Sequence, residues 1–180
     1  MVIASTQSAR AAQLNAKRLE LRRQYWPDVP EAALWHRKES KGFITIPRVL
    51  PIVLSIMDDM SKNRPLSSTY FVLWCRTFDE NMVTTMSPEQ MAFEAGFGGQ
   101  RGAQTWKSRM QILADLGFIM AQPGANGPFS HVLILNPVLV IRRHRETRKA
   151  KVLDAKFNAL ASRASEIGAT DFSIPLRKKK

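Results

Sequence analysis

Between residues 87 and 137 the apolar positions follow two different periods in succession. Spacings of three and four residues, which are typical of helices, cover residues 88–95 and then residues 100–117. Short stretches typical of strands follow at residues 118–123 and 131–137. The segment therefore predicts, in order, a short helix, a tight turn, a longer helix and a strand-turn-strand hairpin.

The first helix of this segment has several start signals that agree. Ser87 stands at the N-cap, a proline follows at the first helical position, and Gln90 is placed for the reciprocal hydrogen bond of a capping box. Such a cap stabilises a helix by about 1 kcal/mol. Gly96 then ends the helix, and the glycines at 98–99 permit a tight reversal, so we expect the second helix to begin near Gln100.

The second helix is expected to bury one side and to expose the other. Its apolar positions recur at helical spacing and are Ala103, Trp106, Met110, Ile112, Leu113, Leu116 and Gly117. The remaining side chains suit nucleic acid, because arginine makes paired hydrogen bonds to guanine, glutamine does so to adenine, and lysine, serine and threonine contact phosphates or mixed base edges. The candidate DNA-binding residues here are Gln100, Arg101, Gln104, Thr105, Lys107, Ser108, Arg109 and Gln111. The alternative is an amphipathic helix whose polar side meets only water.

This order of elements, with the sequence LGFI at residues 116–119 leading into a strand, resembles the winged helix-turn-helix superfamily of bacterial transcriptional regulators and plasmid replication-control proteins. The resemblance covers about residues 66–140. It implies that the second helix enters the major groove of duplex DNA and that the loop GANGPFS is a wing that probes the minor groove or the backbone. The wing tip carries no lysine or arginine, so Asn126 is its candidate contact and strong insertion is not expected.

The elements upstream of this segment are expected to complete one core. Cys75 lies in the apolar stretch TYFVLWC, which predicts a core position rather than a nucleophile. Asp58 and Asp59 are expected to face water, since adjacent helical residues diverge too far to share a metal ion. The predicted elements are a strand at 42–47, a helix at 49–62, a helix at 68–78 and a strand at 82–86.

Cations gather after Pro137. Six lie in a window of ten residues that holds one acidic residue, and they are Arg142, Arg143, Arg145, Arg148, Lys149 and Lys151. We expect them to contact phosphates, the alternative being a solvated helix face. An apolar stripe then follows, formed by Val152, Leu153, Phe157, Leu160 and Ala164. The stripe is expected either to dock on the chain's own core or to pair with a second copy as a homodimer.

The N-terminal residues 5–24 predict a basic helix with a thin apolar stripe. Trp26 and Trp35 flank a basic segment and could stack on single-stranded bases, although such residues more often pin a loop to a core. Over the whole chain, Lys and Arg outnumber Asp and Glu 27 to 15, which gives a formal net charge of +12 in 180 residues. That balance favours a polyanionic partner.

Other function classes lack their signals. No phosphate-binding loop of the Gly-Lys-Ser or Gly-Lys-Thr type occurs, the three histidines are far apart, and one cysteine excludes a disulfide framework. We therefore expect no enzyme activity, no cofactor and no metal site. No stretch reaches the roughly 18 apolar residues of a membrane span, so we expect no membrane partner and a cytoplasmic location.

The sequence thus predicts a mainly α protein with a small β-hairpin wing, that is, an α+β winged helix-turn-helix with basic N- and C-terminal helical extensions. The expected function is sequence-specific binding of duplex DNA. The alternatives are an assembly subunit that binds a protein or a ribonucleoprotein, and an RNA-binding protein. The expected divisions are residues 1–41 as a basic helix and linker, 42–140 as the winged-helix domain, 141–168 as a basic C-terminal helix, and 169–180 as a disordered basic tail.

Overall fold

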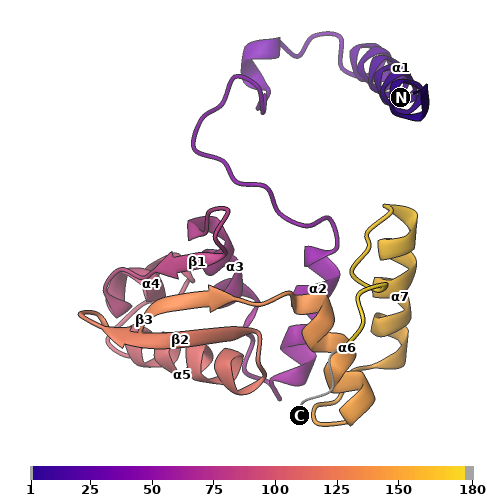
Figure 1. The fold of residues 1–180 in the computed structure, drawn as a ribbon. Coiled ribbons are helices and arrows are strands. Elements are labelled where there is room, and N and C mark those ends of the chain that lie inside the picture. Colours follow the sequence, from indigo (N-terminus) through magenta and orange to yellow (C-terminus); the bar gives the residue numbers. More distant parts are fainter. Residues whose placement is uncertain (1, 177–180) are drawn as a thin grey trace. The chain divides into compact units, whose positions relative to one another are not determined.

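The computed structural model describes residues 2–176, apart from the side chains of residues 2–8, 10 and 11. The chain forms two compact units, which meet in the sequence between Phe43 and Ile44. The described part contains seven α-helices, one short 3-10 helix and a small antiparallel sheet (Figure 1). The architecture is therefore mixed, with mainly helices and a few strands, as expected for an α+β protein.

The N-terminal unit begins with helix α1 (Val2–Tyr25), which confirms the predicted helix and extends it at both ends. The 3-10 helix η1 (Glu31–Ala33) follows. Glu31 forms an ion pair with Arg22 of α1, so the chain folds back on the end of the helix. This ion pair therefore gives the N-terminal unit a contact between its two helical elements.

The two tryptophans of this unit stay at its surface. Trp26 packs edge-to-face on Tyr25, and Trp35 packs in the same way on Phe43. Their exposed fractions are nevertheless 60% and 67%. The two tryptophans therefore do not pin a loop to a core. Their stacking on single-stranded bases stays a prediction.

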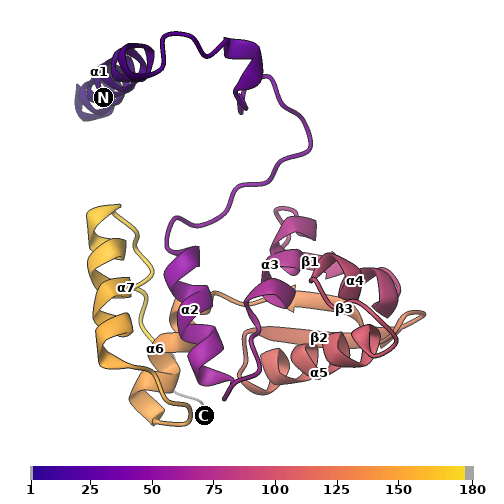
Figure 2. The same ribbon diagram turned by 180° about the vertical axis from the view of Figure 1, so that it is seen from behind.

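The second unit holds the core of the protein (Figures 1 and 2). Its strands form one antiparallel sheet in the order β1-β3-β2, in which β1 and β2 both pair with β3. Helices α4 and α5 lie on one face of the sheet in both views. The elements are α2 (Leu50–Met60), α3 (Ser67–Arg76), β1 (Met82–Thr84), α4 (Pro88–Glu94), α5 (Gly102–Asp115), β2 (Ile119–Gly124), β3 (Gly127–Ile134), α6 (Pro137–Thr147) and α7 (Asp154–Glu166).

Buried aromatic side chains join the helices to the sheet. Trp106 of α5 is fully buried and meets Phe129 of β3 edge-to-face, with the ring centroids 6.1 Å apart. Tyr70 of α3 meets Phe118, at the start of the hairpin, at 6.0 Å. Aromatic pairs of this geometry add about 1 kcal/mol beyond the burial of their area. The buried side of α5 agrees with the predicted one, because Trp106, Met110 and Leu113 are all in the core.

Helix α7 packs on the chain's own core, which was one of the two predicted uses of its apolar stripe. Leu160 and Ala164 are buried in the same cluster as the residues of α2. An ion pair of 2.6 Å between Lys156 Nζ and Asp59 Oδ2 ties α7 to α2. The stripe is thus largely occupied within the chain, and no observation bears on a homodimer.

The predicted strand at residues 42–47 is wrong. No strand forms there, and Phe43 and Ile46 are both exposed. Alternation of apolar and polar residues favours a strand only where a neighbouring strand supplies hydrogen bonds, and this segment has no such neighbour among the described residues. The strand predicted at 82–86 is confirmed in a shorter form as β1.

Helices α2 and α3 correct two further predictions. Cys75 is exposed on α3 rather than buried in the core. Asp58 does not only face water, because its Oδ1 accepts hydrogen bonds from the backbone N–H groups of Leu66 and Ser67, at 2.6 and 2.9 Å. The carboxylate thus caps the start of α3 from a distance in sequence, which capping patterns between neighbours do not reveal.

The C-terminal region is two helices rather than the single basic helix expected over 141–168. The chain leaves α6 at Arg148, whose backbone is left-handed with φ 52°, and re-enters a helix at Asp154. Residues 169–176 are ordered rather than a disordered tail: Phe172 packs on Phe157, and Asp171 accepts a hydrogen bond from Asn136. The basic end at 177–180 lies outside the described residues.

Candidate nucleic-acid interface

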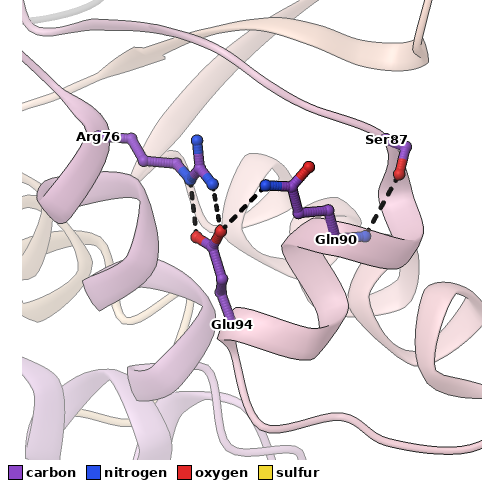
Figure 3. Close-up of polar contacts among 4 residues, drawn as sticks. All are labelled: Arg76, Ser87, Gln90 and Glu94. Carbon is purple, nitrogen blue, oxygen red and sulfur yellow. Dashed lines mark hydrogen bonds and ion pairs between the residues drawn. The ribbon is translucent and has the colours of Figure 1, made fainter.

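Helix α4 is fixed at both ends, and this positions the turn that leads to α5 (Figure 3). At its start the Ser87 hydroxyl accepts a hydrogen bond from the Gln90 N–H at 3.3 Å, as predicted. The reciprocal bond of a capping box is absent, because the Gln90 side chain donates to Glu94 instead, at 3.5 Å. At its end Glu94 accepts two hydrogen bonds from Arg76 of α3, one of them 2.8 Å long from Nε.

This Arg76–Glu94 pair is expected to make stability depend on pH. The hydrogen bonds from Arg76 lower the pKa of the Glu94 carboxyl below its usual value, against an opposing effect of partial burial. A lowered pKa in the folded state stabilises the fold above the usual carboxyl pKa of about 4.3, and this contribution is lost as the pH falls through the folded-state value. Glu94→Gln should therefore lower the free energy of unfolding by about 0.5 kcal/mol at pH 7.

Urea unfolding of wild type and variant at neutral and at strongly acidic pH measures this effect. Glu80→Gln is the matched control, because Glu80 is exposed and makes no ion pair in the described part of the chain. The difference between wild type and Glu94→Gln should vanish in acid. An equal loss at both pH values would show that the pair does not act through the charge of Glu94.

The turn between α4 and α5 brings two backbones close together. Gly96 and Gly99 have positive φ values of 81° and 77°, as the predicted reversal requires. Helix α5 starts at Gly102, slightly later than expected, where a Cβ atom would overlap the carbonyl oxygen of Phe97. Only glycine fits this close approach, which sets the angle at which α5 leaves the turn.

The predicted DNA-binding residues of α5 divide into two groups. Helical residues advance by about 100° each, so positions 104, 108 and 111 share one side. The exposed residues are Gln100, Arg101, Gln104 and Gln111, and the half-buried ones are Thr105, Lys107, Ser108 and Arg109. Gln111 donates a hydrogen bond of 2.8 Å to Asp115, so its amide is partly engaged. Gln100 and Arg101 lie in the turn before the helix, which leaves their side chains at its exposed end.

Arg109 lies on the flank of α5. Its guanidinium is 6.0 Å from the centre of the Phe97 ring, and its buried Nε has no hydrogen-bond partner among the described residues. Partial burial and the nearby guanidinium of Arg64 both lower the pKa of Arg109 below its usual value. Two arginines held near each other without a carboxylate form a positive surface that favours phosphate.

Sequence reasoning missed the contribution of the α2–α3 connection to this surface. Lys62 and Arg64 are exposed there, and the backbone at Lys62 and Asn63 is left-handed, with φ values of 51° and 67°. The two cations were visible in the sequence between two predicted helices. What the sequence could not give is the packing of α3 on α5, which brings this connection beside α5 (Figures 1 and 2).

The hairpin differs from its predicted form at the tip. Strand β3 begins at Gly127, so residues expected in a seven-residue loop belong to the strand. Asn126 is exposed, but its side-chain amide donates to the Thr85 carbonyl at 2.8 Å, and its N–H donates to the Ser130 hydroxyl at 2.9 Å. The Asn126 side chain, which was expected to touch DNA, therefore forms a hydrogen bond within the protein. This bond joins the tip of the hairpin to the segment after β1.

Two of the six C-terminal cations that were expected to contact phosphates have partners inside the protein. Arg142 donates to the carbonyls of Asp171 and Ile174, at 2.8 and 2.7 Å. Arg145 forms an ion pair with Asp154. The residues that remain exposed, without an ion pair in the described part of the chain, are Arg143, Arg148, Lys149 and Lys151.

Comparison with protein-family models, with curated proteins and with solved structures gave no match to this chain. Among the residues that the structure describes, no group of three or more histidine, cysteine, aspartate or glutamate side chains is arranged to hold a metal ion. No helix of the described chain is both long and apolar enough to cross a membrane.

Proposed function

We propose that residues 66–140 form a winged helix-turn-helix and that the protein binds duplex DNA in a sequence-specific manner. In this proposal α4 and α5 are the helix-turn-helix, α5 is the recognition helix, and β2 and β3 are the wing. The order α3-β1-α4-α5-β2-β3 and the strand order β1-β3-β2 support it. The biological role that fits best is a transcriptional regulator or a replication-control protein of a bacterial plasmid or mobile element.

One observation carries the proposal more than any other. The side of α5 that bears Gln104 is exposed, while the opposite side, with Trp106 and Met110, is completely buried. Because its buried side is fixed in the core, α5 can enter the major groove without moving its backbone. Arg101 and the cations Lys62 and Arg64 are suited to reach phosphates on either side of such a groove.

A second candidate function is an assembly role, and one feature favours it. On the sheet, Met82 of β1 pairs with Leu133 of β3, which pairs in turn with Met120 of β2. All three side chains are exposed and form one apolar row across the strands. Exposed apolar rows are typical of protein interfaces, so a protein or ribonucleoprotein partner is the alternative to DNA.

Selection from a random duplex pool, followed by fluorescence anisotropy over a salt series, tests the proposal. We expect the full chain to enrich one sequence and to bind it more tightly than a scrambled duplex. Arg101→Ala and Gln104→Ala should each weaken the specific complex about tenfold or more, because a paired base contact is worth about 1–3 kcal/mol.

Arg163→Ala is the charge-matched control. It removes one cation from α7, where Arg163 pairs with Glu166, without altering α5. Equal, salt-sensitive binding to every duplex and to single-stranded RNA, unaffected by the α5 variants, would contradict base recognition by α5. It would favour the assembly role.

A further inference from the structure

The end of α1 and the 3-10 helix η1 form a hollow of about 780 Å³. All of the residues that line it belong to the N-terminal unit. Hollows that hold small organic ligands in proteins usually measure about 300–1,000 Å³, so this one has room for a nucleotide. Its apolar lining comes from Trp26, Pro27, Val29 and Leu34.

Three charged side chains complete the lining, and two of them are paired with each other. Glu31 of η1 forms an ion pair with Arg22 of α1, which joins the two sides of the hollow. His36 Nε2 also lies 3.1 Å from Glu31 Oε2. The third charged side chain, Arg23, is exposed and forms no ion pair in the described part of the chain. The hollow is therefore held in shape without a ligand, and its net charge is positive.

The apolar side chains around this hollow do not build a core. Among the residues of the N-terminal unit whose burial the structure describes, none is buried. Trp26 packs edge-to-face on Tyr25, with the ring centroids 5.8 Å apart, and yet more than half of it is exposed. The indole of Trp26 is therefore positioned by its neighbour and still accessible to a flat aromatic ligand.

Charge indicates which aromatic ligand suits this hollow. Lys and Arg outnumber Asp and Glu 8 to 4 in residues 1–43, which favours an anion over a neutral partner. A nucleotide joins a flat aromatic base to an anionic phosphate. Proteins that hold single strands stack unpaired bases on aromatic side chains and bind the phosphates with nearby cations. Trp26 and Arg23 supply this combination within one hollow.

We propose that the hollow binds an unpaired nucleotide of a single-stranded nucleic acid. The base stacks on Trp26 beside the apolar side chains of Val29 and Leu34, and the phosphate binds Arg23. Duplex DNA is a poor ligand for this hollow, because its bases are paired and stacked on one another. The hollow is therefore a second binding site, and it does not depend on the proposed duplex binding by α5.

Fluorescence anisotropy of the full chain with a short, labelled oligo-dT strand tests the site over a salt series. Trp26→Ala should weaken binding about tenfold, because stacking of one base is lost, and should leave the salt dependence unchanged. Trp26→Phe should retain most of the affinity, since phenylalanine also stacks. Arg23→Ala should make the log-log salt slope shallower by about 0.7, the value for one phosphate contact of a single strand.

Trp35→Ala is the matched control. Trp35 belongs to the same unit and is as exposed as Trp26, but it does not line the hollow. Its variant should bind oligo-dT as wild type does. An abasic strand of the same length, which keeps the phosphates without the bases, should bind about tenfold more weakly than oligo-dT. The site is overturned if the abasic strand binds equally well, if Trp26→Ala binds as wild type does, or if Trp35→Ala loses as much affinity as Trp26→Ala.

Two further ligands separate this site from related ones. Oligo-U has the same phosphates and a stacking base on a ribose, so tighter binding of oligo-U or of oligo-dT identifies RNA or DNA as the preferred strand. The duplex selected by the wild-type chain should bind Trp26→Ala unchanged, whereas Gln104→Ala should lose that duplex and keep oligo-dT. Loss of single-strand binding alone would overturn the hollow and leave the proposed function intact, and loss of duplex selection alone would do the reverse.

Discussion

Replacing Gly102 with alanine should destabilise the second unit by about 3 kcal/mol, the cost of forcing extra volume into a packed site. A Cβ atom there would overlap the Phe97 carbonyl oxygen and would lie 3.2 Å from the Phe97 carbonyl carbon and 3.7 Å from the Cβ of Ala92. Because the obstacle is backbone, it cannot rotate away as a side chain would. The clash should therefore displace α5 from α4. If α5 is the recognition helix, as proposed, the variant should also bind duplex DNA more weakly.

Gly98→Ala provides the matched control for this experiment. Gly98 lies in the same turn, has no positive φ, and a Cβ there meets nothing within 4 Å. Urea unfolding followed by tryptophan fluorescence should show wild-type stability for Gly98→Ala, within about 0.5 kcal/mol, and a clear loss for Gly102→Ala. Equal stabilities would mean that the α4–α5 turn relaxes without cost, and that its geometry does not fix α5.

Leu160→Ala is the second change with a large expected effect. Leu160 of α7 is completely buried in the core, and truncation of such a leucine costs about 3 kcal/mol through lost burial and the cavity that remains. Leu153, at the N-cap of the same helix, is 37% exposed, so Leu153→Ala should cost much less. Thermal unfolding of both variants measures the difference.

The dependence on protein concentration separates the two uses of the α7 stripe. If α7 packs only on the chain's own core, the stability lost in Leu160→Ala should be the same at low and at high protein concentration. A loss that shrinks as the concentration rises would indicate that Leu160 also contributes to a dimer, since association stabilises a folded state by mass action. That result would support the predicted homodimer.

Local signals in the sequence predicted the helices around the site well. The Ser87 cap and the apolar spacing from Trp106 to Leu113 depend on residues within a few positions of each other, and both are confirmed. The segment at 42–47 failed because a strand needs a partner that local alternation does not supply. The spacing of apolar residues thus predicts which type of element a segment favours, but not which other element it will pair with.

The charged surface was harder to predict for the same reason. The sequence predicts that Arg142 and Arg145 contact phosphates, yet both side chains have partners within the protein, at Asp171 and Asp154, which lie 29 and 9 residues away. Arg64 was overlooked because its position beside Arg109 depends on how α3 packs against α5. The charge count predicts a polyanionic partner, whereas which cations stay unpaired depends on tertiary contacts.

The hydrogen bond from Asn126 to Thr85 has a consequence for how the hairpin can be used. A hairpin tip that is already tied down loses little conformational entropy when a partner meets it. For the same reason it cannot adapt its shape to different partners. If the hairpin touches DNA, selectivity there should come from the width and stiffness of the groove rather than from bonds to bases. Sequences that narrow or widen the groove at that point should then differ in affinity, even where the base pairs touched by α5 are identical.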